Sequence, residues 1–218
     1  MDKLNPPGQS SAQKRKRLFI NRKTSAKERL KIVNWAAENK YNALVFSLND
    51  RFFSRGNSRA EYVKLAKQHA FLIEAGGRDF SLLLPRRLFL FHRDLFRMEL
   101  GKRKPNPHFC PTNPAVTSRI TERARYLFSR AMAHMTVPRI FHLLPDEGQE
   151  NTWCACPACR AFSPSEQNLI AVNSAADALA ALDPKAWLSF YDFDVETEGI
   201  TPRENTFRLS LPEKPAGF

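Results

Sequence analysis

The chain has 218 residues, of which 43% are hydrophobic and 26% are charged, and its net charge is +12. This is the composition of a globular protein rather than a disordered one, and the length allows one sizeable core. No apolar run approaches the roughly 18 residues that span a bilayer, and the N-terminus lacks the apolar segment of a secretory signal. We therefore expect a cytoplasmic protein without membrane association.

The charge is unevenly placed along the chain. Residues 1–162 are strongly basic, whereas residues 163–218 carry nine acidic and four basic residues. Residues 1–15 are rich in Pro, Gly, Ser and Gln and lead into the basic run KRKR, which predicts a disordered basic tail. A basic surface favours contact with polyanions, so nucleic-acid binding is one function to weigh.

The pattern predicts alternating strands and helices, in which apolar runs and capping residues set the boundaries. Ser25 and Glu28 form a capping box, and Gly76 and Gly77 suit the left-handed end of a helix. In chain order the expected elements are a strand at 16–23, a helix at 24–40, a strand at 41–48, a helix at 58–77, a strand at 79–85, a helix from 114, a strand at 137–145, a helix at 163–184 and a strand at 186–194.

This alternation predicts an α/β fold with right-handed crossovers and parallel strands. A doubly wound sheet and a (β/α) barrel both fit, and we expect a barrel-like, partial domain of about five βα units over 16–200. Residues 201–218 are expected to be a C-terminal extension with at most one edge strand. No G-x-G-x-x-G and no P-loop follows a strand, which leaves nucleotide binding by those devices unsupported.

Ionisable residues collect where the predicted strands end, which is where barrel enzymes build their sites. His142 alternates onto the same face of its strand as Asp146. Because glycoside cleavage uses a carboxylic acid and a second carboxylate, the pair Asp146–Glu147 is the candidate catalytic pair. The candidate substrate-binding residues at this edge are Asp50, Arg87, His142 and Asp192.

The four cysteines of the chain are Cys110 and the three of WCACPACR at 153–160. Thiols in a chain without a secretory signal favour metal binding or reduced cysteines over disulfides. A loop of C-x-C-x-x-C plus one further thiol supplies the four ligands of a closed, structural zinc site. Zinc held by Cys110, Cys154, Cys156 and Cys159 is thus expected; reduced thiols or a disulfide with spare thiols are the alternatives.

The segments GKRKPNPHFCPTNPAV at 101–116 and WCACPACR at 153–160, separated by a strand and an acidic turn, resemble a bacterial domain-of-unknown-function family, number 4838. That family is related to glycoside-hydrolase barrels such as hexosaminidases and α-glucuronidases, and the resemblance covers roughly residues 42–194. It implies a (β/α) barrel that processes carbohydrate, with Glu147 as the general acid and Asp146 orienting a substrate acetamide or charge. The likeness is one of fold.

Two functions therefore remain open on the sequence. The favoured one is a glycoside-hydrolase-like domain, active or degenerate, that binds carbohydrate and holds a structural zinc. The alternative is a non-catalytic, zinc-stabilised basic module that binds nucleic acid. An eight-stranded barrel typically needs about 250 residues, so association with another chain to complete the barrel is a further expectation.

Overall fold

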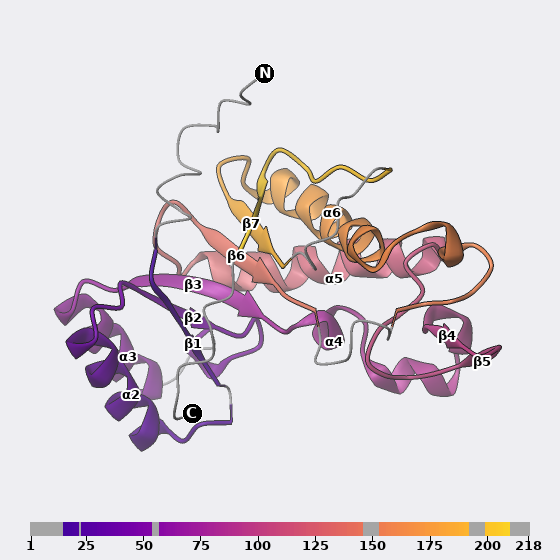
Figure 1. The fold of residues 1–218 in the computed structure, drawn as a ribbon. Coiled ribbons are helices and arrows are strands. Elements are labelled where there is room, and N and C mark those ends of the chain that lie inside the picture. The colour runs from indigo at the N-terminus through magenta and orange to yellow at the C-terminus, as the bar shows by residue number, and fades with distance from the viewer. Residues whose placement is uncertain (1–14, 22, 54–56, 146–152, 192–198, 210–218) are drawn as a thin grey trace.

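The computed structural model describes residues 15–21, 23–53, 57–145, 153–191 and 199–209. Its centre is a six-stranded sheet in the order β1-β2-β3-β6-β7-β8, in which every neighbouring pair is parallel. The strands are β1 (Arg17–Ile20), β2 (Ala43–Phe46), β3 (Leu72–Gly77), β6 (Ile140–Leu143), β7 (Trp187–Phe190) and β8 (Thr206–Arg208). This confirms the expected α/β fold with parallel strands, and the spatial order follows the chain order as in a barrel (Figure 1).

Helices connect these strands and cover one side of the sheet. The main ones are α2 (Ala26–Glu38), α3 (Asn57–Gln68), α5 (Pro114–Met132) and α6 (Pro164–Leu182). Ser25 and Glu28 form the expected capping box at the start of α2, and Ser163 and Glu166 form a second one at the start of α6. Pro114 occupies the first turn of α5 behind Asn113, whose side chain accepts from the Ala115 N–H. These local signals fix the helix starts.

The predicted boundary between the second helix and the third strand was wrong. The helix α3 ends at Gln68, where Ala70 adopts a left-handed conformation with φ 54° and Phe71 N–H bonds to the Ala66 carbonyl. This is a Schellman ending built on alanine, so the glycine signal at Gly76 and Gly77 pointed too far along the chain. Both glycines instead end strand β3, and the predicted strand at 79–85 contains the short helix α4 (Phe80–Leu83).

The outer face of the sheet packs against the helices and forms the main core. Alternate strand residues such as Leu44, Phe46 and Phe141 are buried there, together with Val116, Leu127 and Leu179 of the helices. The helices α5 and α6 lie side by side over the β6–β7 half, and α2 and α3 cover the β1–β2 half (Figure 1). One-sided cover by helices is the arrangement of a barrel rather than of a doubly wound sheet.

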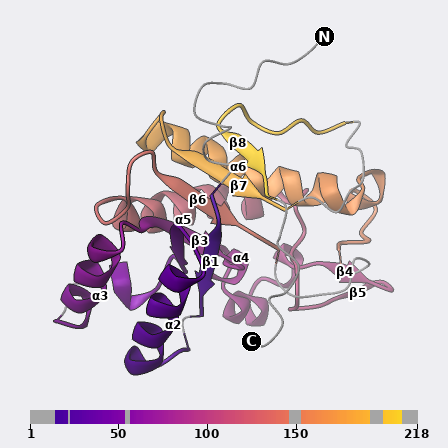
Figure 2. The same ribbon diagram turned by 60° about the vertical axis from the view of Figure 1, so that its left-hand side comes forward.

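The sheet curls strongly, so that its two edge strands approach each other on the inner face. The guanidinium of Arg17 on β1 lies 5.8 Å from the ring centre of Phe207 on β8. Phe19 of β1 also packs in an apolar cluster with Ile140, Leu144 and Phe207. Figure 2 shows the fold turned by 60°, with β8 beside β7 at the end of the sheet. The domain is therefore a partial barrel of six strands: five in the predicted βα units and β8, the edge strand that the sequence allowed after residue 200.

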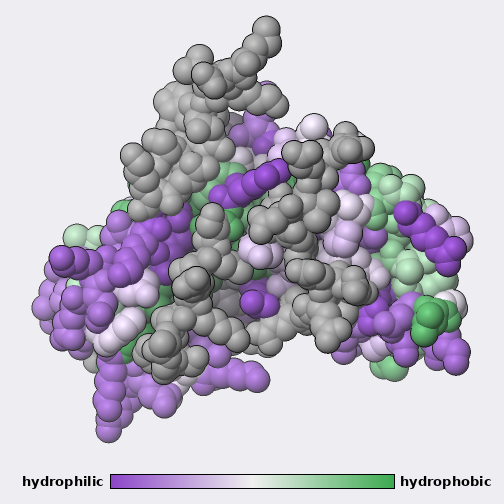
Figure 3. All heavy atoms as spheres, in the orientation of Figure 1, coloured by the Kyte–Doolittle hydropathy of each residue, from purple (hydrophilic) through white to green (hydrophobic). Residues whose placement is uncertain are grey.

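A segment of little regular structure follows β3 and separates it from α5. It contains α4, the 3-10 helices η2 (Arg86–Leu90) and η3 (Arg93–Leu95), and a hairpin of β4 (Met98–Glu99) and β5 (Lys102–Arg103). Leu90, Phe91 and Leu100 of this segment are exposed hydrophobic residues. In Figure 3 hydrophobic groups reach the surface on the right, whereas the surface over α2 and α3 on the left is mainly hydrophilic. Within the described ranges, no helix has the length and apolarity needed to cross a membrane.

Candidate functional site

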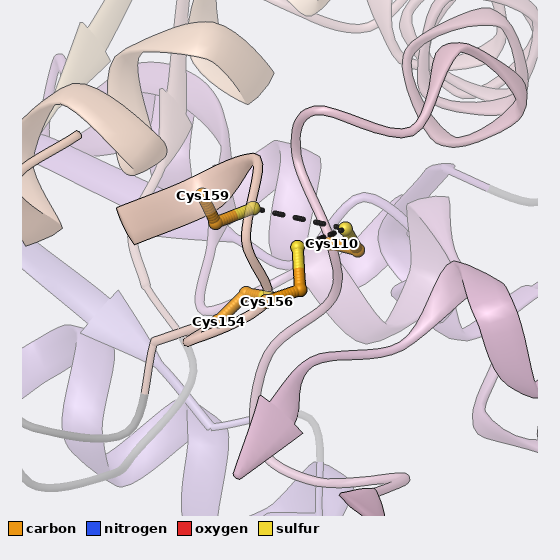
Figure 4. Close-up of side chains that lie close together, drawn as sticks. All are labelled: Cys110, Cys154, Cys156 and Cys159. Carbon is orange, nitrogen blue, oxygen red and sulfur yellow. Dashed lines mark hydrogen bonds between the residues drawn. The ribbon is translucent and has the colours of Figure 1, made fainter. Parts of the chain in front are cut away.

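The four cysteines converge beyond the carboxyl ends of β3 and β6. Cys110 ends the irregular segment after β3, and Cys154, Cys156 and Cys159 lie in the loop after β6 (Figure 4). Gln167 of α6 shapes that loop, because its side-chain oxygen accepts from the Cys154 N–H at 3.0 Å and its amide donates to the Cys159 carbonyl at 3.3 Å. The Ala155 N–H bonds to the Met98 carbonyl at 2.8 Å, which ties the loop to β4.

The sulfur geometry is that of a four-coordinate metal site. All four sulfurs lie within 4.8 Å of one another and all four residues are buried. Cys110 Sγ lies 3.7 Å from Cys156 Sγ and 3.7 Å from Cys159 Sγ, and all four cysteines are free of disulfides. Tetrahedral coordination at a metal–sulfur distance of about 2.3 Å places the sulfurs about 3.8 Å apart. The cluster can therefore hold a metal ion, as the spacing of the cysteines predicted.

Hydrogen-bond donors surround the sulfurs. The Met98 N–H donates to Cys154 Sγ at 3.2 Å, the Thr112 hydroxyl lies 3.1 Å from Cys159 Sγ, and the Arg103 guanidinium lies 3.8 Å from Cys154 Sγ. Hydrogen bonds from Cys154 and Cys159 lower the pKa of Cys110, and those same contacts raise the pKa of Cys154 to about 11 and raise that of Cys159. A bound cation would stabilise the thiolate form of all four cysteines.

The inner face of the barrel carries a second buried cluster, which is ionic. Glu74 of β3 accepts from Arg17 at 2.7 Å and from Arg15 at 2.7 Å. The His142 ring lies 2.7 Å from the same carboxylate through Nε2 and 2.6 Å from the Ser189 hydroxyl through Nδ1. Glu74, His142 and Ser189 have no exposed surface. The network joins β1, β3, β6 and β7 across the inside of the barrel.

The pKa shifts of Glu74 and His142 indicate which of the two side chains carries a proton at neutral pH. Burial alone would raise the pKa of Glu74, but the His142 hydrogen bond and the arginine charges lower it to about 2. Burial lowers the pKa of His142 despite the neighbouring carboxylate. The histidine is therefore neutral beside an ionised Glu74, and it donates through Nε2–H while its Nδ1 accepts from Ser189.

The structure places the predicted site residues in different environments. Asp50 is buried and forms a two-pronged ion pair with Arg29 of α2, at 2.7 and 2.8 Å, and also accepts from the Phe52 N–H. Both ring nitrogens of His142 form hydrogen bonds, Nδ1 with Ser189 and Nε2 with Glu74. Arg87 is exposed in η2, so it follows a short helix and not the end of the predicted strand. Asp146, Glu147 and Asp192 lie outside the described residues, and the roles of all six in substrate binding or catalysis stay predictions.

Sequence reasoning missed three of the residues that organise the inner face. Glu74 was assigned to a helix, although a glutamate inside the apolar run FLIEAGG is a signal of a buried charge pair. Asp79 follows β3 and accepts from the Ser47 hydroxyl at 2.7 Å and the Leu48 N–H at 2.8 Å, which links the ends of β2 and β3. Ser189 could be found only from its partner, because a serine in a strand carries no distinguishing pattern.

A third polar cluster lies next to the cysteines. Arg86 donates to the Pro107 carbonyl, and Arg97 donates to the Asn106 carbonyl at 2.7 Å, so both guanidiniums hold the segment that precedes His108. The His108 ring stacks on Trp153, with ring centres 4.1 Å apart and planes 5° from parallel. Burial and the charges of Arg86 and Arg97 lower the pKa of His108 to about 3, so the imidazole is neutral.

Comparison with known proteins supports the fold. The structure is similar to a β-N-acetylhexosaminidase from Bacteroides fragilis, with a TM-score of 0.55, 14% identity, and cover of 88% of this chain and 44% of that one. It is also similar to a GH20 catalytic module of the pneumococcal exo-β-D-N-acetylglucosaminidase StrH, with a TM-score of 0.56, 11% identity, and cover of 90% and 59%. The domain has a glycoside-hydrolase-like barrel fold.

The similarity covers only part of each solved structure. The chain spans about half the length of these two solved structures. No protein-family model matches the sequence, and no curated protein matches it either. The resemblance to family 4838 is thus without support from a family model, whereas the expected relation in fold to hexosaminidase barrels is confirmed.

Proposed function

We propose that this domain is a carbohydrate-binding and carbohydrate-processing barrel whose substrate lies at the carboxyl ends of the strands. The observation that carries the proposal is the similarity in fold to glycoside-hydrolase barrels. Barrel enzymes build their sites at the carboxyl ends of the strands, which here include β3 and β6. Strand β6 leaves the sheet beside β3, where the Leu144 N–H bonds to the Gly77 carbonyl at 2.8 Å. The acidic pair Asp146–Glu147 follows directly in the sequence.

In this proposal Glu147 is the general acid and Asp146 orients the substrate acetamide or charge. A general acid must be protonated near neutral pH, which requires burial or a like-charged neighbour to raise its pKa from about 4.3. Asp146 is that neighbour in the sequence. Asp50, Arg87, His142 and Asp192 are the proposed supporting residues. Of these, Asp50 would act from its ion pair with Arg29, and His142 from its hydrogen bond with Glu74.

We further propose that the metal of the cysteine cluster is zinc with a structural role. Four cysteine ligands leave no open coordination position, which is the pattern of structural rather than catalytic zinc. The cluster links the irregular segment after β3 to the loop after β6, so the metal would hold together the two loops that flank the proposed substrate site.

The test of the activity compares aryl glycosides with good and poor leaving groups, starting with N-acetylglucosaminides. General acid catalysis is typically worth about 10²–10⁴-fold, so Glu147→Gln should lower cleavage of substrates with poor leaving groups by that order. Substrates whose leaving group needs no proton should be affected much less. Equal loss on both kinds would make Glu147 a binding residue, and no cleavage by the wild type would leave a binding-only barrel.

A further inference from the structure

The outer face of helix α5 carries a row of cationic side chains around one tyrosine. Four residues follow one another at intervals of four, three and four and form what we call the arginine row: Arg119, Arg123, Tyr126 and Arg130. This spacing places them on one face of the helix, over a length of about 16 Å. Arg119 is half-buried and the other three are exposed, whereas the opposite face of α5 is buried in the main core.

Tyr126 restrains two of the guanidiniums in this row. The Arg123 guanidinium lies 5.0 Å from the centre of the Tyr126 ring, and the Arg130 guanidinium lies 5.7 Å from it. Arg123 also donates through Nε to the Leu82 carbonyl at 3.3 Å. Contacts of this kind restrict long side chains, so less conformational entropy is lost when a ligand binds. The two guanidiniums are therefore partly pre-organised for binding.

The charge of the row is not balanced by carboxylates of the helices around it. Helix α5 contains four arginines and one acidic residue, Glu122, and the ion pairs within the described part of the chain include none with an α5 arginine. On the neighbouring helix α6, Asp177 pairs with Arg203 at 2.8 Å, and Asp183 at its end pairs with Arg139 at 2.7 Å. Like charges four residues apart also repel each other, so the row destabilises α5 unless an anion lies on it.

A chain of regularly spaced anions matches such a row, and a nucleic-acid backbone is a chain of this kind. Each nucleotide carries one phosphate, and arginine binds phosphate oxygens through two parallel N–H donors. An aromatic ring among cations is also the combination by which proteins bind single strands without sequence preference. The net charge of +12 on the whole chain favours the approach of a polyanion.

We propose that the arginine row on α5 binds the phosphate backbone of single-stranded nucleic acid without sequence preference. Arg119, Arg123 and Arg130 each contact a phosphate, and Tyr126 positions the last two guanidiniums. Helix α5 lies in the layer of helices outside the sheet (Figure 1), whereas the proposed carbohydrate site is at the carboxyl ends of the strands. The two proposals are therefore independent, and either can fail without the other.

The experiment measures binding of the full chain to a fluorescein-labelled oligothymidylate of about 16 nucleotides by fluorescence anisotropy, at salt concentrations from about 50 to 200 mM. Each phosphate contact in a single strand contributes about 0.7 to the slope of log K against log salt, so Arg123→Gln combined with Arg130→Gln should make the slope shallower by about 1.4. Lys64→Gln combined with Lys67→Gln is the matched control. It removes the same charge from exposed residues of α3 and should change the slope much less.

Equal changes of slope and affinity in the α5 and α3 variants would overturn the proposal, because binding would then follow net charge alone. A wild-type chain that does not bind the oligonucleotide at about 50 mM salt contradicts it as well. Heparin as a second probe tests an anionic polysaccharide: an α5 variant that loses heparin binding but keeps oligonucleotide binding rejects nucleic acid as the ligand. If the loss of the Arg123 bond to Leu82 prevents folding, Arg119→Gln combined with Arg130→Gln leaves that bond intact and should give the same change of slope.

Discussion

The inner face of the barrel and the cysteine cluster are both buried polar sites, but they balance their charge in different ways. Glu74 is ionised and meets two arginines and a neutral histidine, so the protein supplies every partner it needs. The cysteine cluster has four acidic groups, and Arg103, at 3.8 Å from Cys154, adds one positive charge beside them. Protonation of Glu74 would weaken the ionic network, whereas a bound metal ion would stabilise the thiol cluster. Burial alone therefore does not distinguish the two sites; they differ in whether the charges of the protein side chains balance one another.

Loss of a metal ligand should have the largest effect. Cys159→Ser leaves three sulfurs, and we expect a loss of more than about 4 kcal/mol in the free energy of unfolding, because a structural metal couples binding to folding. Chemical denaturation with and without a chelator measures it. Met98→Leu is the control, since Met98 packs on the cluster without being a ligand and a volume-conserving exchange should cost less than about 1.5 kcal/mol. A Cys159→Ser protein as stable as Met98→Leu would contradict the metal site.

Removal of the central carboxylate of the inner face should come next. Glu74→Gln removes the buried carboxylate with which both Arg15 and Arg17 pair, and breaking such a pair typically costs about 3–5 kcal/mol. Asp177→Asn breaks the exposed pair of Asp177 with Arg203 and should cost less than about 1 kcal/mol. Urea denaturation at pH 7 compares the two variants. If both lose the same small amount, the inner network contributes no more than a surface pair.

Acid should weaken the inner network. The folded pKa of Glu74, about 2, is below the ordinary 4.5, so its contribution is present above pH 4.5 and is lost as the pH falls toward 2. The lowered pKa of His142 acts in the same direction below about 6.5, because the unfolded ring binds the proton more readily. For Glu74 alone the loss at pH 3 is about 2 kcal/mol. Stability measured from pH 7 to 3 should fall less steeply in Glu74→Gln; an unchanged slope would exclude Glu74 as its cause.

The smallest effect is expected at the end of the network. Ser189→Ala removes the hydroxyl that bonds to His142 Nδ1 and leaves a buried acceptor unsatisfied, which costs about 1–3 kcal/mol. Thermal unfolding at pH 7 measures the change, with Ser129→Ala on the exposed side of α5 as the control. A neutral effect of Ser189→Ala would mean that water replaces the hydroxyl.

Much of the fold could be predicted from the sequence, because the signals are local. The capping box at Ser25 and the proline Pro114 in a first turn predicted helix starts, and apolar runs predicted the strands. The alternation of strands and helices then predicted a parallel sheet. The boundary of α3 could not be predicted, since its end is formed by Ala70 in a left-handed conformation that alanine rarely adopts. The added strand β8 has three residues and depends on pairing with β7, which is a tertiary effect.

The two candidate sites also differ in how far the sequence could predict them. The cysteine cluster could be predicted because thiol spacing within one loop reports directly on geometry. The inner network could not, because Arg17, Glu74, His142 and Ser189 are brought together only by strand register and by the curl of the sheet. Gly76 illustrates how close that register is: a side chain there would meet the His142 carbonyl oxygen at 2.0 Å, so only glycine fits between β3 and β6.

The most direct test of the metal site is to determine the metal content and coordination of the protein purified without added metal. Elemental analysis should give close to one zinc per chain, and X-ray absorption at the zinc edge should give four sulfur neighbours at about 2.3 Å. Absence of bound metal, a disulfide among Cys110, Cys154, Cys156 and Cys159, or a coordination shell of oxygen and nitrogen would contradict the site.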